Sequence, residues 1–322
     1  MVSFLQITMK ENFIRSSKDK CDKMDKKKQK SVESKDIGLI GGERSTTSML
    51  RTSRNASKPV KLLGITIEGM GHEDRIEFGK GYAKKLLEKH GENLVYFGIG
   101  GSTFKNNDRK DSDIDGILVA ENRKGWPSKW PEHVVRGITI GVAYYTVDEL
   151  NDIMAVPNYM WPYRAYRVTN SIPFYQKYDL IGKYKETIKN IDPQKFVEAS
   201  AQQITIAFSS LGKIKYNASI GDLAAVRSSA TETFAEFLDS TVALLNKELL
   251  PTGGYGFRSL RHIAQFKDVP KDYVRLSTII WESSKPEEIE SASTKLLVNT
   301  FAFAKRYGVV IPNLKSVSEV PV

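Results

Sequence analysis

The chain has 322 residues, of which 40% are hydrophobic, and its formal net charge at pH 7 is +10. This length allows one large or two modest domains with an ample core. The single cysteine, Cys21, excludes a framework of internal disulfides and a cysteine-rich zinc site, and no apolar run reaches the roughly 18 residues of a membrane span. The first residues lack the charged lead and apolar core of a secretory signal, so we expect a cytoplasmic protein without membrane contact.

The basic excess is concentrated in the first 60 residues. They contain 14 Lys and Arg against 7 Asp and Glu, whereas the rest of the chain has 34 against 31. Between Ser16 and Asp36 the sequence is rich in Lys and Ser, with almost no large apolar residue, which predicts a disordered basic tail over residues 1–58. The remainder is nearly balanced in charge, so nucleic acid is not an expected partner, although the tail leaves a nucleic-acid arm open.

Order is expected to begin near Val60. A helix whose apolar positions from Ile76 to Leu87 share one face should end at Gly91. Strands are then expected in three apolar, β-forming runs, at residues 94–98, 116–120 and 137–145.

The last of these strands leads into a cap and helix start from Thr146 to Leu150. Trp126 begins a stiff aromatic loop, which ends at Pro131 and which we expect to cap the sheet.

A glycine turn and two carboxylates flank the polar loop between the first two strands. An apolar run leads into Gly100, Gly101 and Ser102, and eleven residues after the serine comes Asp113, followed by Asp115. Because side chains alternate along a strand, both carboxylates are expected on one face of the sheet.

These residue types suit a nucleoside triphosphate and its metal. Mg²⁺ usually takes one or two carboxylates together with substrate phosphates, so we expect Asp113 and Asp115 to bind Mg²⁺. Glycines let backbone N–H groups approach an anion, and Ser102 adds a hydroxyl and is expected to open a short helix. Gly100, Gly101 and Ser102 are therefore the expected nucleotide-binding residues, in an arrangement for phosphoryl or nucleotidyl transfer.

The stretch resembles the motif of the nucleotidyltransferase superfamily, which includes DNA polymerase beta and the antibiotic nucleotidyltransferases. Ile99 to Ser102 match its apolar residue and glycine turn, and Asp113 to Asp115 match its acid-apolar-acid element, whereas Gly116 stands where an apolar residue is more usual. The resemblance implies that Asp113 and Asp115 are catalytic and bind the metal, and that the turn holds the triphosphate.

The third carboxylate that members of this superfamily usually carry on a later strand is missing. It would fall at Thr139 or Gly141, and neither is a carboxylate. Glu132 before that strand and Asp148 after it are the nearest substitutes, and we expect Asp148 to be a cap or first-turn acid of the next helix. The general base is left without an assigned residue.

After about residue 190 the pattern becomes helical. The predicted helices, which Pro and Gly separate, span Phe196–Tyr216, Leu223–Leu249, Phe257–Phe266, Tyr273–Trp281 and Ile289–Tyr307. They predict an all-α bundle. Within it, Tyr216, Asp222, Leu244–Asn246 and Val269–Tyr273 resemble the helical C-terminal domain of kanamycin-type nucleotidyltransferases. In those relatives the acceptor sits between two domains, often across a dimer, so the resemblance allows a homodimer.

The expected fold class is therefore α+β. A small mixed β-sheet nucleotidyltransferase core with flanking helices occupies residues 59–176, and a helical bundle domain occupies residues 177–322.

Two sets of charged residues in the helical region have two interpretations each. Glu232, Glu236 and Asp239 form an acidic stripe that would suit a cationic acceptor, but a solvated helix face is the expected structure. Arg258 and His262, one turn apart, are expected to form a surface pair, with a phosphate contact as the alternative.

Three functions follow from these residues. The first is a Mg²⁺-dependent enzyme that moves a nucleoside monophosphate onto a hydroxyl of a small-molecule acceptor and releases pyrophosphate. The second is a catalytically silent relative that binds a nucleotide or a partner protein, which the missing third acid favours. The third is a polymerase or RNA-modifying protein that uses the basic tail.

Overall fold

The structure, a computed structural model, describes residues 61–62, 65–66, 68–127, 132–251, 257–313 and 315–316. All of the described residues fall within the unit formed by residues 57–322. The predicted basic tail lies outside the described residues, as do residues 128–131 of the aromatic loop.

A five-stranded mixed sheet lies at the centre of the N-terminal half of this unit, in the order β5-β6-β4-β3-β7. Its strands are β3 (Leu94–Ile99), β4 (Ile114–Ala120), β5 (His133–Val135), β6 (Ile138–Thr146) and β7 (Ile172–Gln176). Strands β4 and β6 are parallel, and the other neighbouring pairs are antiparallel. The three predicted strands are confirmed as β3, β4 and β6, whereas β5 and β7 were not predicted. A separate antiparallel pair joins β1 (Lys61–Leu62) and β2 (Ile65–Thr66).

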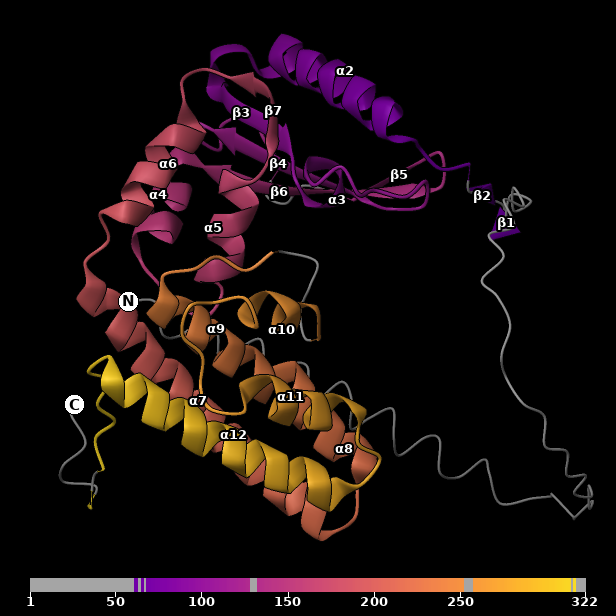
Figure 1. Cartoon of the computed structure of the whole chain (residues 1–322). Helices are drawn as coiled ribbons and strands as arrows, with labels where there is room; N and C mark the ends of the chain where they lie inside the picture. The colour runs from indigo at the N-terminus through magenta and orange to yellow at the C-terminus, as the bar shows by residue number, and fades with distance from the viewer. Residues whose placement is uncertain are drawn as a thin grey trace, which may run out of the picture. The chain divides into compact units, whose positions relative to one another are not determined.

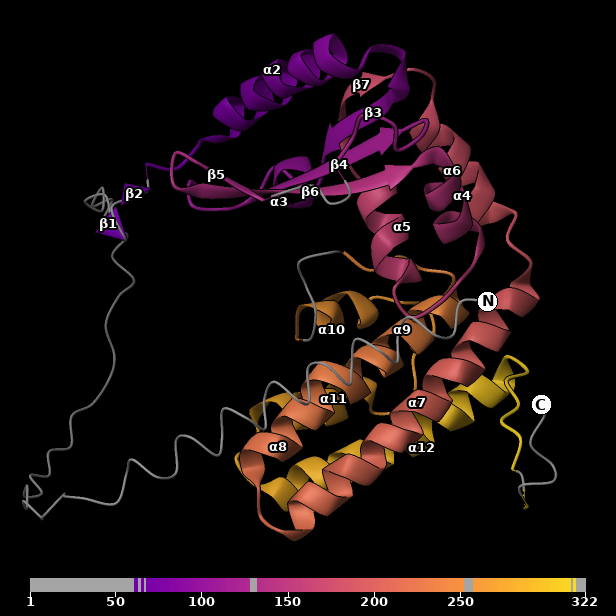
Figure 2. The same cartoon turned by 180° about the vertical axis from the view of Figure 1, so that it is seen from behind.

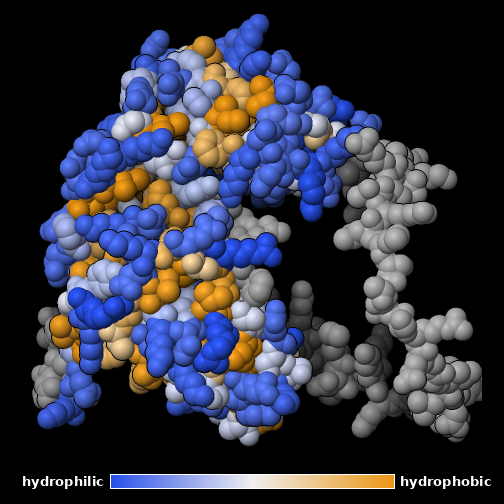
Figure 3. Space-filling view, viewed as in Figure 1, coloured by the Kyte–Doolittle hydropathy of each residue, from blue (hydrophilic) through white to orange (hydrophobic). Residues whose placement is uncertain are grey.

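Helices cover both faces of the sheet (Figures 1 and 2). The helices and helical turns of this half are α2 (His72–His90), η2 (Gly91–Asn93), α3 (Gly101–Phe104), α4 (Val147–Ala155), α5 (Trp161–Thr169) and α6 (Leu180–Lys189). Helix α2 packs on one face, where Leu86 belongs to the same buried cluster as Leu118 and Ile140. Ile117 and Val119 point to the opposite face and belong to the cluster that includes residues of α4, α5 and α6. The outer surface over α2 is mainly hydrophilic (Figure 3).

Local signals set the ends of two of these helices as predicted. Gly91 follows α2 with φ of 51°, a left-handed value that costs glycine little, and its N–H donates to the carbonyl of Leu87. Thr146 caps α4: its hydroxyl accepts from the N–H of Glu149, whose carboxylate accepts from the N–H of Thr146. Asp148 is a first-turn acid of α4, as expected.

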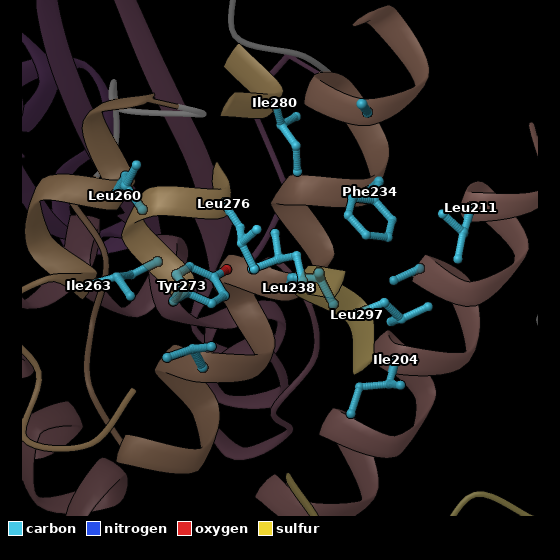
Figure 4. Packing of buried hydrophobic residues seen from close by; sticks show 14 of the residues in the cluster. Ile204, Leu211, Phe234, Leu238, Leu260, Ile263, Tyr273, Leu276, Ile280 and Leu297 are labelled. Atoms are coloured by element: carbon cyan, nitrogen blue, oxygen red, sulfur yellow. The ribbon is translucent and has the colours of Figure 1, made fainter. Parts of the chain in front are cut away.

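The C-terminal half is helical. Its elements are α7 (Pro193–Ser219), α8 (Leu223–Ser228), the π-helical segment η3 (Ser229–Phe234), α9 (Ala235–Asn246), α10 (Phe257–Ile263), α11 (Tyr273–Glu282) and α12 (Pro286–Arg306). The helix predicted over Leu223–Leu249 is thus three consecutive segments with a π-helical stretch in the middle. Figure 4 shows side chains of α7, η3 and α9 to α12 meeting in one buried cluster, with Leu238 and Leu276 near its centre.

The predicted fold class is confirmed as α+β, a mixed sheet with flanking helices followed by a helical region. The two regions share buried contacts: Tyr163 of α5 belongs to the helical cluster, and Leu244 of α9 belongs to the cluster on the sheet. The boundary between residues 176 and 177 stays a prediction. No helix among the described residues combines the length and apolar character needed to cross a membrane.

Candidate functional site

The glycine turn lies directly against Asp115. Strand β3 ends at Ile99, and the N–H of Gly100 donates to the backbone carbonyl of Asp115 at 2.9 Å. Gly101 has φ of 61°, and a Cβ at this position would overlap the Asp115 carboxylate. A side chain at position 101 would be strained at this φ and would overlap the carboxylate, so only glycine fits and the turn packs directly against Asp115.

Ser102 is the second residue of α3, which confirms the predicted short helix after the turn. The N–H of Gly100 already donates to the carbonyl of Asp115, so Gly100 shapes the turn. Gly101 and Ser102 lie in the first turn of α3, where backbone N–H groups have no partner within the helix.

Asp113 and Asp115 come together at the start of β4. Asp115 shares its face with Ile117 and Val119, the face that α5 covers, because side chains alternate along the strand. Asp113 directly precedes the strand and is exposed. Burial of part of the carboxyl, and then the charge of Asp115, raise the pKa of Asp113. The two carboxylates are thus close enough to repel each other, and a bound cation would relieve that repulsion.

Arg167 of α5 is a site residue that the sequence did not reveal. Its Nη2 donates to Oδ1 of Asp115 at 2.9 Å, and the side chains of both residues are about one quarter exposed. The charge of Arg167 also lowers the pKa of Asp113, against the two larger effects. Helix α5 was not predicted and the pair spans 52 positions, so no local pattern indicated the contact.

Arg75 of α2 fixes the loop that leads to the acids. Its side chain is fully buried, and its Nε lies 3.2 Å from Oδ2 of Asp108, whose other oxygen contacts Nδ1 of His72 at 2.7 Å. The two Nη atoms donate to backbone carbonyls of the loop, those of Arg109, Lys110, Ser112 and Asp113, at 2.7–3.4 Å. The sequence signal for this role was the position of Arg75 on the apolar side of an amphipathic helix, because a buried arginine needs polar partners.

One of the two positions predicted for the missing third carboxylate, Gly141, lies beside Asp115 in the sheet. Asp115 pairs with Gly141 across the parallel strands β4 and β6, so Gly141 is the neighbour of the acid. Asp148 lies beyond Thr146, which is roughly 16 Å along β6 from Gly141, and is too far away to substitute. Glu132 is exposed and precedes β5, which lies on the far side of β6 from Asp115. Within the described residues, no three or more His, Cys, Asp and Glu side chains form a group that could hold a metal ion.

The acidic stripe of the helical region is not the expected solvated face. Asp239 is 4% exposed and accepts a 2.7 Å hydrogen bond from the hydroxyl of Tyr273. Glu236 is half-buried, and Glu232 alone is exposed. The prediction is wrong for Asp239 because this helix is covered by α11, whose Tyr273 supplies a polar partner inside the core. Asp239 is therefore not available to a cationic acceptor.

His262 of α10 lies near the motif loop. It is half-buried, and burial, followed by the charge of Lys105, lowers its pKa. The Lys105 ammonium lies 5.3 Å from the centre of the Tyr166 ring on α5. The expected surface pair with Arg258 is untested, because the Arg258 side chain lies outside the description.

No protein-family model matches the chain, and the search of curated proteins returned no match. A solved structure of a nucleotidyltransferase-like protein from Exiguobacterium sibiricum is similar over 72% of this chain and 78% of that chain, with 8% sequence identity and a TM-score of 0.43. Likeness at this level does not establish a shared activity, so the proposals below rest on the residues of this chain.

Proposed function

We propose that the chain is a nucleotidyltransferase that binds a nucleoside triphosphate with Mg²⁺ and transfers the nucleoside monophosphate to a hydroxyl of a small-molecule acceptor. The observation that carries this proposal is the contact of Gly101 with the Asp115 carboxylate. It joins a backbone turn suited to anions with an oxygen ligand suited to Mg²⁺.

The residues fit one Mg²⁺ ion. Asp113 and Asp115 would hold it, since both are oxygen donors and their mutual repulsion favours a cation. When bound, Mg²⁺ would neutralise charge on the phosphates. Gly101 and Ser102 would hold the triphosphate, and the positive charges of Lys105 and Arg167 beside the turn favour an anionic ligand.

In the transfer, a hydroxyl oxygen of the acceptor attacks the α-phosphorus, the bond to the pyrophosphate leaving group breaks, and the hydroxyl proton goes to a base that is not assigned. The acceptor's identity as a small molecule and a homodimeric state are predictions that accompany this proposal.

Calorimetric titration with each nucleoside triphosphate, with and without Mg²⁺, tests the donor site. We expect Mg²⁺-dependent binding that Asp113→Asn and Asp115→Asn each weaken by about 100-fold, because each removes a charged metal ligand. Asp111→Asn is the matched control: it removes an exposed acid of the same loop, paired with Arg109 at 3.2 Å, and binding should persist. Equal affinity of wild type and Asp115→Asn would contradict the proposal.

A catalytically silent nucleotide-binding protein is the second candidate, and glycine at position 141 favours it. The two candidates differ in pyrophosphate release in the presence of Mg²⁺ and a panel of hydroxyl acceptors. Pyrophosphate that Asp115→Asn abolishes would exclude the silent protein. Mg²⁺-dependent nucleotide binding without pyrophosphate release from any acceptor would favour it.

A further inference from the structure

The strand beside Asp115 has an open position where a third metal ligand would fit. Asp115 and Gly141 are paired in the parallel register, so a side chain at position 141 would project to the same face about 4.8 Å away. A Cβ built on Gly141 meets no atom within 4 Å. The room for a third carboxylate is therefore present, and the sequence places none there.

A guanidinium group contacts Asp115 instead. Arg167 Nη2 uses Oδ1 of Asp115, while Nε of the same side chain is buried and has no hydrogen-bond partner in the described part of the chain. A buried donor without an acceptor is costly, and such groups are rare in folded proteins. This Nε is closed to solvent, so the donors of Arg167 that a ligand oxygen can meet are the remaining Nη donors of its partly exposed side chain.

We infer that the site takes a single divalent cation with its nucleotide, and that Arg167 supplies the positive charge that a second cation would otherwise supply. The inference rests on the proposed function and specifies the positive charges at its nucleotide-binding site, which are one divalent cation and Arg167.

The charges of the site support one cation. Before the negative charges of the nucleotide are counted, the two carboxylates and one guanidinium of the chain sum to −1, and one divalent cation changes this to +1. In two-metal sites the ions lie about 3.5–4 Å apart. A second ion here would share Asp113 and Asp115 with the first, without a ligand from β6, and would be repelled by both the first ion and Arg167.

Arg167 can meet the nucleotide at the same time as Asp115. A guanidinium presents five donors in a planar fork, which suits phosphate oxygens, and the contact with Asp115 uses one of them. The remaining Nη donors, on a side chain that is partly exposed, then donate to a phosphate oxygen of the bound nucleotide. Arg167 is in this role a substrate-binding residue and not only a partner of Asp115.

Counting bound manganese tests the inference without requiring turnover. Mn²⁺ is titrated into protein saturated with the α,β-methylene analogue of ATP, and free Mn²⁺ is measured by electron paramagnetic resonance. We expect one ion per chain in the wild type and in Gly141→Ala, which fills the open position without a ligand. The double variant Gly141→Asp/Arg167→Gln, with three carboxylates and no guanidinium, should bind two.

Arg167→Gln alone gives the second measurement. It should leave the count at one ion and weaken binding of the analogue by about 10- to 100-fold, the range for loss of a hydrogen bond to a charged group. Circular dichroism melting of each variant verifies folding. If the double variant fails to fold, the ion count of the wild type and the affinity of Arg167→Gln for the analogue test the inference.

Two ions bound to the wild type would overturn the inference and leave the proposed function in place. Unchanged affinity of Arg167→Gln for the analogue would overturn the role of Arg167, and a folded double variant with one ion would overturn the charge argument. A wild type that binds neither the analogue nor manganese would overturn the proposed function, and the inference with it.

Discussion

The acids of the motif region and the acid of helix α9 are held in different ways. Asp108 pairs with Arg75 at 3.2 Å and Asp115 with Arg167 at 2.9 Å, whereas Asp239 has the hydroxyl of Tyr273 as its partner. A guanidinium stabilises an ionised carboxylate, but a hydroxyl in a core does not offset the loss of hydration. Burial, with a smaller effect from the charge of a neighbouring glutamate, raises the pKa of Asp239 to about 7.

This difference in partners distinguishes the acids of the motif region, which can bind a cation, from Asp239, which has a structural role. The motif region can present negative charge at neutral pH, because arginines compensate it only in part. Asp239 is close to half-protonated at neutral pH and has no access to solvent, so spacing on a helix surface does not by itself create a binding site.

Arg75→Met removes the cation that holds Asp108 and the donor to the loop carbonyls. We expect a loss of about 4 kcal/mol in the free energy of unfolding, because the variant takes the guanidinium from a buried carboxylate and removes its hydrogen bonds to the loop carbonyls. Urea unfolding measures it. Arg227→Met is the control, an arginine of α8 whose Nη2 donates to the carbonyl of Ser283, and it should cost less. Equal losses in the two variants would contradict the special position of Arg75.

Asp239→Asn should increase stability at alkaline pH and not at acid pH. The pKa is raised from 3.8 to about 7, so the folded chain holds this proton more tightly than the unfolded chain. The stabilisation from the proton is complete below pH 3.8 and is lost as pH rises through 7.

The asparagine does not titrate, so at pH 8 the variant should be more stable than wild type by about 4 kcal/mol, and at pH 4 the two should be similar. Unfolding in urea at both pH values measures the difference. Glu232→Gln, at an exposed acid of the same stripe, should show no such change.

Tyr273→Phe removes the hydroxyl partner of Asp239. The expected loss is about 1–2 kcal/mol at pH 8, where the carboxylate is ionised, and less at pH 5, where the protonated acid is easier to bury. Thermal melting at the two pH values checks it. A larger loss at pH 5 than at pH 8 would mean that the hydroxyl stabilises the protonated form.

Asp111→Asn should change the free energy of unfolding by less than about 0.5 kcal/mol. The carboxylate is mostly exposed, and its pair with Arg109 is on the surface, where such contacts contribute little. The same urea experiment measures it. A loss comparable to that of Arg75→Met would remove the distinction between buried and exposed acids of the loop.

The sequence was sufficient for those parts whose signals are local. Strand β4 with its acids, the glycine turn, the cap at Thr146 and the helix end at Gly91 each depend on residues within a few positions of one another. For the missing carboxylate the sequence left Thr139 and Gly141 open, and the register of β6 against β4 then pairs Gly141 with Asp115.

What the sequence did not reveal depends on distant residues. Helix α5 follows Met160 without a capping side chain, and its Arg167 meets Asp115 from 52 positions away. Arg75 meets its loop from 34 to 38 positions away. The burial of Asp239 depends on α11, which comes 34 residues later. The position of Arg75 on the apolar side of its helix indicates burial but not its partners, and the contacts of Arg167 and Asp239 leave no periodic pattern, because tertiary packing and not local propensity creates them.

Arg75 recognises its loop through main-chain oxygens, and every amino acid supplies the same oxygen. The side chains of Arg109 and Lys110 can therefore be exchanged without removing the bonds that Arg75 makes to the loop, whereas the Ser112 hydroxyl also accepts a hydrogen bond from the N–H of Arg109. A library randomised at positions 109 and 110 would sample new surface chemistry near Asp113 while the bonds from Arg75 to the loop backbone persist.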